Sequence, residues 1–132
     1  MNYKPILLIS GEPNSIFLEI FFKSLKYKKI RSPLILIASQ KLLRLQMKKL
    51  NFNKKIKILD YNNILDLKID NKSINLINVN YNTSKAFEKI STKSNKYINN
   101  CFEVAFKIIK KNNINKIITG PISKKTFLNK KY

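Results

Sequence analysis

With 132 residues, 44% of them hydrophobic, the chain can bury one core but is too short for two ordinary domains. It has 27 Lys and Arg against 7 Asp and Glu, a formal net charge of +20 at pH 7. A single Cys excludes an intramolecular disulfide, the lack of His removes the commonest metal ligand, and no apolar run is long enough for a membrane span. The lone Cys and the lack of a signal-peptide pattern predict a cytoplasmic protein.

The first half of the chain alternates buried strands with amphipathic helices. Residues 5–9 form a continuous apolar run, typical of a strand covered on both faces, and lead into a turn at residues 11–15. Apolar residues then recur at helical spacing over residues 16–27. The same order returns with a strand at residues 33–38 and a helix at residues 39–50.

The second half begins with weaker signals. Residues 55–59 alternate charged and apolar side chains as a strand does, and residues 60–72 read as a loop with room for one helical turn. Residues 73–79 predict another strand, placed at an edge because it alternates. Residues 80–93 are polar and irregular, the composition of a mobile segment, and residues 95–112 form the clearest helix.

A last strand is expected at residues 114–119, followed by a short helix that residues 123–125 open and that includes residues 126–128. Strands that alternate with helices predict an α/β fold, a mostly parallel sheet with helices on both faces. We interpret residues 1–132 as a single incomplete α/β domain, because the sequence stops inside a predicted element.

The basic charge invites a nucleic-acid hypothesis, since Lys and Arg release counterions from phosphate backbones. Only Arg31 and Arg44 are Arg, the Lys residues are spread along the chain, and Lys, Asn and Ile are enriched together as an A+T-rich genome would produce. Nucleic acid is therefore an unlikely main partner, and phosphorylated small molecules fit the charge better.

Two turns follow predicted strands and carry the functional interest: GEPNS after the first strand and TGPISKK after the last. In an open α/β sheet, ligands bind beyond the carboxyl ends of the strands. Either turn alone is ordinary Gly-Pro turn chemistry, and neither matches a nucleotide-binding fingerprint. If both lie at the same edge of the sheet, they form part of a pocket.

Several side chains in and near these segments have both a possible functional role and a possible structural role. Lys124 could bind a phosphate or carboxylate near a helix start, or be a solvated surface charge, and Ser123 could contact a ligand or cap the helix. Glu12 and Glu19 read as a cap-region charge and a surface charge rather than a catalytic pair. Cys101 lies on the apolar face of its helix and reads as a core residue.

Together the two turns resemble a known family. PILLISGEPNSIFLEIFFKSL, residues 5–25, is similar to the opening of the 4-hydroxythreonine-4-phosphate dehydrogenases of vitamin B6 biosynthesis, which have a G-[DE]-P-A-G-I-G-P-[DE] turn. Residues 94–132 resemble the later segment, in which a helix precedes a strand ending in T-[AG]-P-[IV]-x-K, here residues 119–124. Order and separation both fit, and the resemblance covers essentially the whole chain.

The resemblance implies a two-domain α/β/α oxidoreductase, related in architecture to the isocitrate and isopropylmalate dehydrogenases and working as a cytoplasmic homodimer. Such enzymes oxidise a secondary alcohol of a phosphorylated small molecule with NAD, and the resulting β-keto acid then decarboxylates. A divalent metal polarises the alcohol. The resemblance places substrate contacts at Ser123 and Lys124.

The chain departs from the family pattern in two respects. Asn14, Ser15 and Phe17 stand where the family has Ala and two Gly, so Phe17 is expected to crowd a close backbone approach to a ligand. The family's three metal-binding His residues are all expected beyond residue 132. We therefore expect no catalytic residue and no metal ligand here, and an N-terminal part that is inactive alone.

Two other hypotheses remain open: a basic module that binds RNA or another polyanion, and a degenerate remnant without function. If the rest of the sheet is missing, its open apolar edge predicts that the isolated chain aggregates or melts easily.

Overall fold

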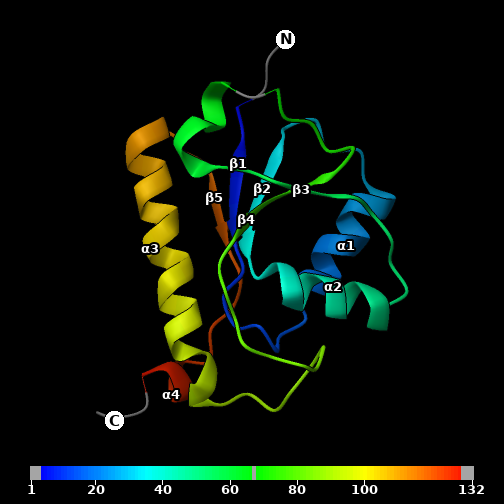
Figure 1. Cartoon of the computed structure of the whole chain (residues 1–132), viewed down its shortest axis with the longest axis vertical. Helices are drawn as coiled ribbons and strands as arrows, with labels where there is room; N and C mark the ends of the chain where they lie inside the picture. The colour runs from blue at the N-terminus through cyan, green and yellow to red at the C-terminus, as the bar shows by residue number, and fades with distance from the viewer. Residues whose placement is uncertain (1–3, 67, 129–132) are drawn as a thin grey trace.

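The structure is a computed structural model that describes residues 4–66 and 68–128 (Figure 1). In this part of the chain, five parallel strands form one sheet in the order β3-β4-β2-β1-β5. The strands are β1 (Ile6–Ile9), β2 (Leu34–Ala38), β3 (Ile56–Ile58), β4 (Ile74–Asn78) and β5 (Ile117–Thr119). The helices are α1 (Phe17–Tyr27), α2 (Gln40–Lys49), α3 (Asn95–Asn112) and α4 (Lys124–Phe127), with 3-10 turns η1 (Tyr61–Asp66) and η2 (Thr92–Ser94).

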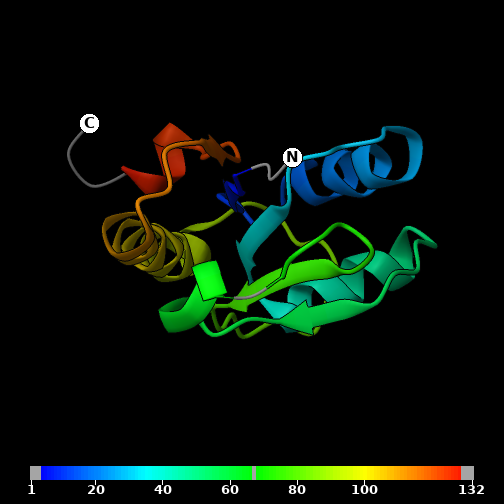
Figure 2. The ribbon, with the colours of Figure 1, turned by 90° about the horizontal axis from the view of Figure 1, so that it is seen from above.

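The elements form three layers, with α1 and α2 on one face of the sheet and α3 on the other (Figure 2). Continuous apolar runs become the central strands, as the sequence predicts, because both faces of these strands are covered. All five residues of β2 are buried, and β1 pairs with it from Ile6↔Leu34 to Ile9↔Ile37. The predicted α/β class, a mostly parallel sheet with helices on both faces, is confirmed.

The prediction that residues 73–79 form an edge strand is wrong. β4 lies between β3 and β2, and its first four residues are buried. Its alternating polar position is Asn75, whose side-chain amide donates to the carbonyls of Leu34 (3.0 Å) and Asp70 (2.7 Å). A buried polar side chain costs little when its hydrogen bonds are satisfied, so alternation does not mark an edge here.

The last strand is shorter than the predicted range 114–119. Asn113 ends α3 in the left-handed conformation (φ 52°), and the chain begins to pair with β1 only where the Leu7 amide donates to the Lys116 carbonyl at 3.0 Å. β5 is an edge strand, and all three of its residues are exposed.

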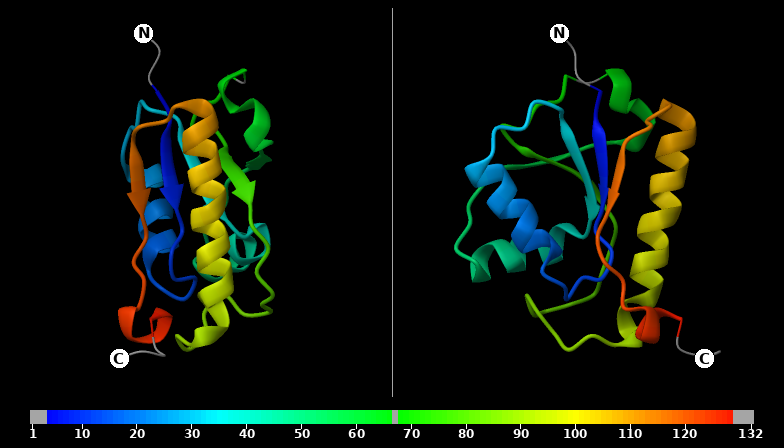
Figure 3. Two further views of the ribbon diagram at one scale, coloured as in Figure 1. Left: turned by 90° about the vertical axis from the view of Figure 1, so that its left-hand side faces the viewer. Right: turned by 180° about the vertical axis from the view of Figure 1, so that it is seen from behind.

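The helix at residues 95–112 has the predicted bounds. It buries Tyr97, Ile98, Cys101, Ala105 and Ile108 against the sheet. The final helix starts at Lys124, where the sequence predicts it to open, and lies beside the beginning of α3 (Figure 3), where the Asn95 amide donates to the Thr126 carbonyl at 3.4 Å. None of the helices described is long and apolar enough to cross a membrane.

Candidate functional site

The turns after β1 and β5 meet at one edge of the sheet. β1 and β5 are neighbours and parallel, so their carboxyl ends lie side by side. The Gly120 amide donates to the Ile9 carbonyl at 2.7 Å, and the Glu12 amide donates to the Pro121 carbonyl at 2.8 Å. The expectation that the two turns share an edge of the sheet is therefore met. We call residues 10–15 and 119–124 the two corners.

The corners lie where the direction of the strand order reverses. From β1 the chain passes through α1 to β2 on one side, whereas α3, on the opposite face, leads to β5 on the other side. In open α/β sheets this switch point is where ligands bind, because the two connections leave a crevice between them. The topology thus favours the corners as a candidate site.

Glycines allow the two corners to touch. Gly11 has φ 67°, and a Cβ added to it would come within 2.6 Å of the Pro121 carbonyl oxygen. A Cβ on Gly120 would collide with the carbonyl oxygen of Ser10. Both glycines are therefore required by backbone packing between the corners.

Phe17, which replaces a family glycine, lies against the same junction. Its Cγ atom would be 3.0 Å from a Cβ on Gly120, so the ring covers the Gly120 backbone. The ring is partly buried and packs on the hydrophobic core. The ring therefore packs against the backbone of the second corner, and its effect on the approach of a ligand stays a prediction.

Glu12 is the buried acid of the first corner, only 3% exposed. The Ser94 hydroxyl donates to its Oε2 at 3.1 Å, and the Asn14 amide nitrogen donates to its Oε1 at 3.2 Å. Ser94 directly precedes α3, so the carboxylate also lies at the positive end of an 18-residue helix. Glu19 instead pairs with Lys23 on the surface of α1 at 3.1 Å. Glu19 is a surface charge as predicted, whereas Glu12 is buried and bonds to Ser94 without capping α1.

Residues 80–93 cross the first corner as an irregular segment, which we call the strap. The strap is held by side chains distant in sequence: the Asn14 side chain accepts from the Glu88 amide at 2.8 Å, and the Gln46 side chain donates to the Pro13 and Ala86 carbonyls, both at 2.9 Å. The sequence predicts the irregular backbone but not these anchors. Polar residues that bond across 30 to 80 positions leave no periodic signal in a sequence.

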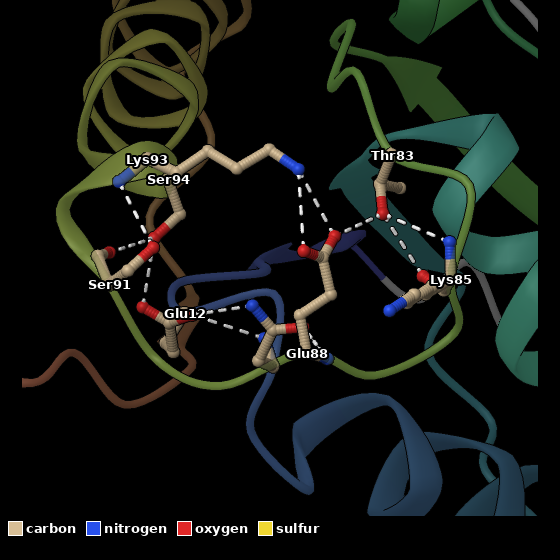
Figure 4. Close-up of polar contacts among 8 residues, drawn as sticks. Glu12, Thr83, Lys85, Glu88, Ser91, Lys93 and Ser94 are labelled. Carbon is tan, nitrogen blue, oxygen red and sulfur yellow. Dashed lines mark hydrogen bonds and ion pairs between the residues drawn. The ribbon is translucent and has the colours of Figure 1, made fainter.

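Glu88 anchors the strap internally (Figure 4). Its carboxylate accepts from the Thr83 hydroxyl at 2.7 Å and from the Lys93 ammonium at 3.1 Å. These hydrogen bonds, that from Thr83 first, hold the pKa of Glu88 below its ordinary value of 4.5. The strap is therefore a hydrogen-bonded structure that joins the first corner to the start of α3.

The two residues predicted to contact substrate lie at the start of α4. Ser123 caps this helix, since its Oγ accepts from the Thr126 amide at 3.4 Å and donates to the Thr126 hydroxyl at 3.2 Å. Lys124 is exposed and is the last residue of the second corner and the first of α4. Both residues thus lie in the second corner, at the start of α4.

A shallow depression of about 370 Å³ lies at the same edge of the sheet, beyond β2 and β4. Its lining is mostly polar: Ser39, Gln40, Lys41, Asn78, Asn80, Tyr81 and Asn82. Sequence reasoning missed this feature, because Asn-rich segments are common in the chain and only the strand order brings these together.

Cys101 is fully buried on α3, and burial raises the pKa of its thiol to about 12. A thiol with so high a pKa is a poor nucleophile at neutral pH. The prediction that Cys101 is a core residue is confirmed. Among the described residues, no three His, Cys, Asp or Glu side chains gather in a way that could hold a metal ion.

Comparisons with solved structures show that the same fold occurs in known proteins. No curated protein sequence matches the chain. Among solved structures, it is similar to the 4-hydroxythreonine-4-phosphate dehydrogenase from Burkholderia phymatum, with a TM-score of 0.77 and 19% identity over 94% of this chain and 38% of that one. It is also similar to the 4-hydroxythreonine-4-phosphate dehydrogenase from Klebsiella pneumoniae, with a TM-score of 0.76. The two sequences are 17% identical, and the match covers 93% of this chain and 38% of that one.

These likenesses show the fold, and the chain spans well under half the length of those solved proteins. The family model for pyridoxal phosphate biosynthetic protein PdxA matches residues 29–132, which include the strap, α3 and the second corner. The chain therefore belongs to the PdxA family of pyridoxal phosphate biosynthetic proteins.

Proposed function

We propose that residues 1–132 form the N-terminal part of an NAD-dependent dehydrogenase that acts on 4-phosphohydroxy-threonine in pyridoxal 5'-phosphate biosynthesis. The proposal rests on one observation above all: two corners with family motifs meet at the topological switch point of a parallel sheet. Family membership and the dehydrogenase names of the similar solved structures support the reaction class.

In this proposal the substrate is bound by side chains and not by the corner amides. The amides of Glu12 and Gly120 both donate within the junction, so neither is free for a phosphate. Lys124 is exposed beside them and carries a flexible ammonium that can pair with the substrate's phosphate or carboxylate. Ser123 lies next to it and can add a hydrogen bond by exchanging its Thr126 partner.

A divalent metal would polarise the substrate alcohol in the complete enzyme. The described residues do not fit such a site, because they hold no group of three metal-ligating side chains. At the corners the available carboxylate is Glu12, which is buried and bonded to Ser94. We therefore assign the metal ligands and the NAD site to other parts of the enzyme.

The same proposal makes residues 1–132 a single incomplete domain of a two-domain, cytoplasmic homodimer that is inactive without the rest. The solved relatives are long enough to accommodate the remaining parts, since this chain covers 38% of their length.

The test is to read the coding sequence beyond residue 132 and assay the complete product with 4-phosphohydroxy-threonine, NAD and a divalent metal. We expect NADH formation, and a loss of about 10- to 100-fold in kcat/KM for Lys124→Ala, the size of one charge-assisted contact. Lys125→Ala, which removes the neighbouring exposed ammonium, is the matched control and should leave kcat/KM nearly unchanged. A complete product that forms no NADH, or that lacks His-bearing metal motifs, would overturn the assignment.

A further inference from the structure

A hollow of about 280 Å³ lies between α1 and the residues that follow α2. Its floor is apolar: Phe22 and Phe52 stack with ring centroids 4.8 Å apart, and Leu50 lies beside them. Its rim carries Lys23, Lys26 and Tyr27. None of the residues at this hollow belongs to either corner, so the proposed function leaves it without a role.

Tyr27 has an unusual environment for a large aromatic residue. It is 70% exposed at the last turn of α1, and the Lys26 ammonium lies 5.4 Å from its ring centroid. An exposed ring of this kind gains little from folding, because most of its apolar surface stays in water. A flat aromatic surface beside a cation is suited to a stacked base that carries a phosphate.

The charge around the hollow is almost wholly positive. Exposed lysines follow Tyr27 at positions 28 and 29 and precede Leu50 at positions 48 and 49. The acid in the lining is Glu19, which is already paired with Lys23 at 3.1 Å. Basic residues in the last turn of a helix also interact favourably with the helix dipole, which explains the positions of Lys26 and Lys48. The dipole does not explain the exposed Tyr27 ring or the hollow.

We propose that this hollow is a docking site for a single-stranded polynucleotide. The bases of the polynucleotide stack on Tyr27, and the lysines at the ends of α1 and α2 neutralise its phosphates. A polymer fits better than a free nucleotide, because the cations extend on both sides of the hollow and one nucleotide needs only one or two of them. This binding is independent of the dehydrogenase activity proposed above.

The test measures binding of a fluorescein-labelled 15-mer of deoxythymidine to the purified 132-residue chain by anisotropy at several salt concentrations. We expect the logarithm of the association constant to fall linearly with the logarithm of the salt concentration. The slope should be about −0.7 for each phosphate neutralised on a single strand. Lys26→Ser, Lys28→Ser and Lys48→Ser together should lower the magnitude of that slope by about 2. Tyr27→Ala should weaken binding by about 5- to 150-fold, as expected for loss of one stacked base.

The matched control removes three exposed lysines from α3, on the opposite face of the sheet: Lys96→Ser, Lys107→Ser and Lys110→Ser. This variant has the same net charge as the triple variant at the hollow, so a general polycation effect would weaken both equally. Equal weakening would overturn the proposal, as would unchanged binding in Tyr27→Ala. Displacement of the 15-mer by AMP at the same nucleotide concentration would overturn it too, because the site would then bind a nucleotide and not a polymer.

Discussion

At the scale of single residues, the junction of the corners depends on two glycines and one buried acid. Gly11 and Gly120 let two backbones touch, and Glu12 joins that contact to the start of α3. The sequence could predict that these residues lie in turns after strands. It could not show that the glycines serve the contact between the turns, because that requirement arises only when β5 pairs with β1.

Gly120→Ala should destabilise the chain by about 1–3 kcal/mol, because the added methyl group meets backbone that has little freedom to move. Urea denaturation followed by circular dichroism measures the change. Ile20→Ala, at an exposed position of α1, is the control and should change stability by about 0.5 kcal/mol or less. Equal stability of Gly120→Ala and the wild type would show that the corners do not touch as described.

Glu12 and Ser94 should be energetically coupled. Ser94→Ala removes a donor from a buried carboxylate and should cost about 1–3 kcal/mol, whereas the same change in a Glu12→Gln background should cost less. A double-mutant cycle should give a coupling free energy of about 0.5–3 kcal/mol. Additive effects of the two substitutions would mean that the hydrogen bond contributes nothing to stability.

Glu88 predicts an acid-sensitive strap. Its pKa is lowered in the folded chain, so its contribution is present above the ordinary value of 4.5 and is lost as the pH falls through the lower folded value. Glu88→Gln should therefore flatten the fall of the urea unfolding midpoint between neutral pH and about pH 3. An unchanged profile in Glu88→Gln would contradict this role.

At the scale of elements, local pattern predicts the helices and central strands well and the polar connections poorly. The bounds of α3 follow from its apolar periodicity and from the Asn residues that end it. The alternation of residues 73–79 predicts an edge strand, whereas backbone carbonyls satisfy the amide of Asn75 inside the sheet. The strap was expected to be mobile for the same reason: its partners, Asn14 and Gln46, are distant in sequence.

The strap should open when its anchor on α2 is removed. Gln46→Met keeps the volume but leaves the carbonyls of Pro13 and Ala86 without their donor, so trypsin should cleave at the exposed Lys85 and Lys89 faster than in the wild type. Cleavage on α3, at Lys107 for example, is the internal control and should not accelerate. Equal rates at Lys85 and Lys89 in both proteins would show that the strap is not held by Gln46.

At the scale of the whole molecule, the sheet has an unusual apolar edge. β5 has no neighbour beyond it in the described chain, and its Ile117 and Ile118 are 43% and 48% exposed. The resemblance to part of a longer fold predicts open apolar edges, and in the described chain β3 and β5 are the edge strands. An exposed apolar edge strand is a site for pairing with another chain.

We therefore expect the isolated chain to aggregate on heating, and Ile118→Lys to suppress that aggregation by placing a charge on the edge. Light scattering during a thermal ramp measures the aggregation. Ile20→Lys, at an exposed position of α1, is the control, because it adds the same charge away from the edge. Cooperative, reversible unfolding of the wild-type chain without scattering would contradict an open edge.

We propose that Ser123 and Lys124, in the second corner where it meets the first, bind the phosphorylated substrate. The most direct measurement is an NMR titration of the 15N-labelled chain with 4-phosphohydroxy-threonine, beside the Lys124→Ala variant. The account predicts amide shifts that cluster at Gly11, Gly120, Ser123 and Lys124 and that disappear in the variant. Shifts scattered over lysines throughout the chain, or an unaltered response in Lys124→Ala, would contradict it.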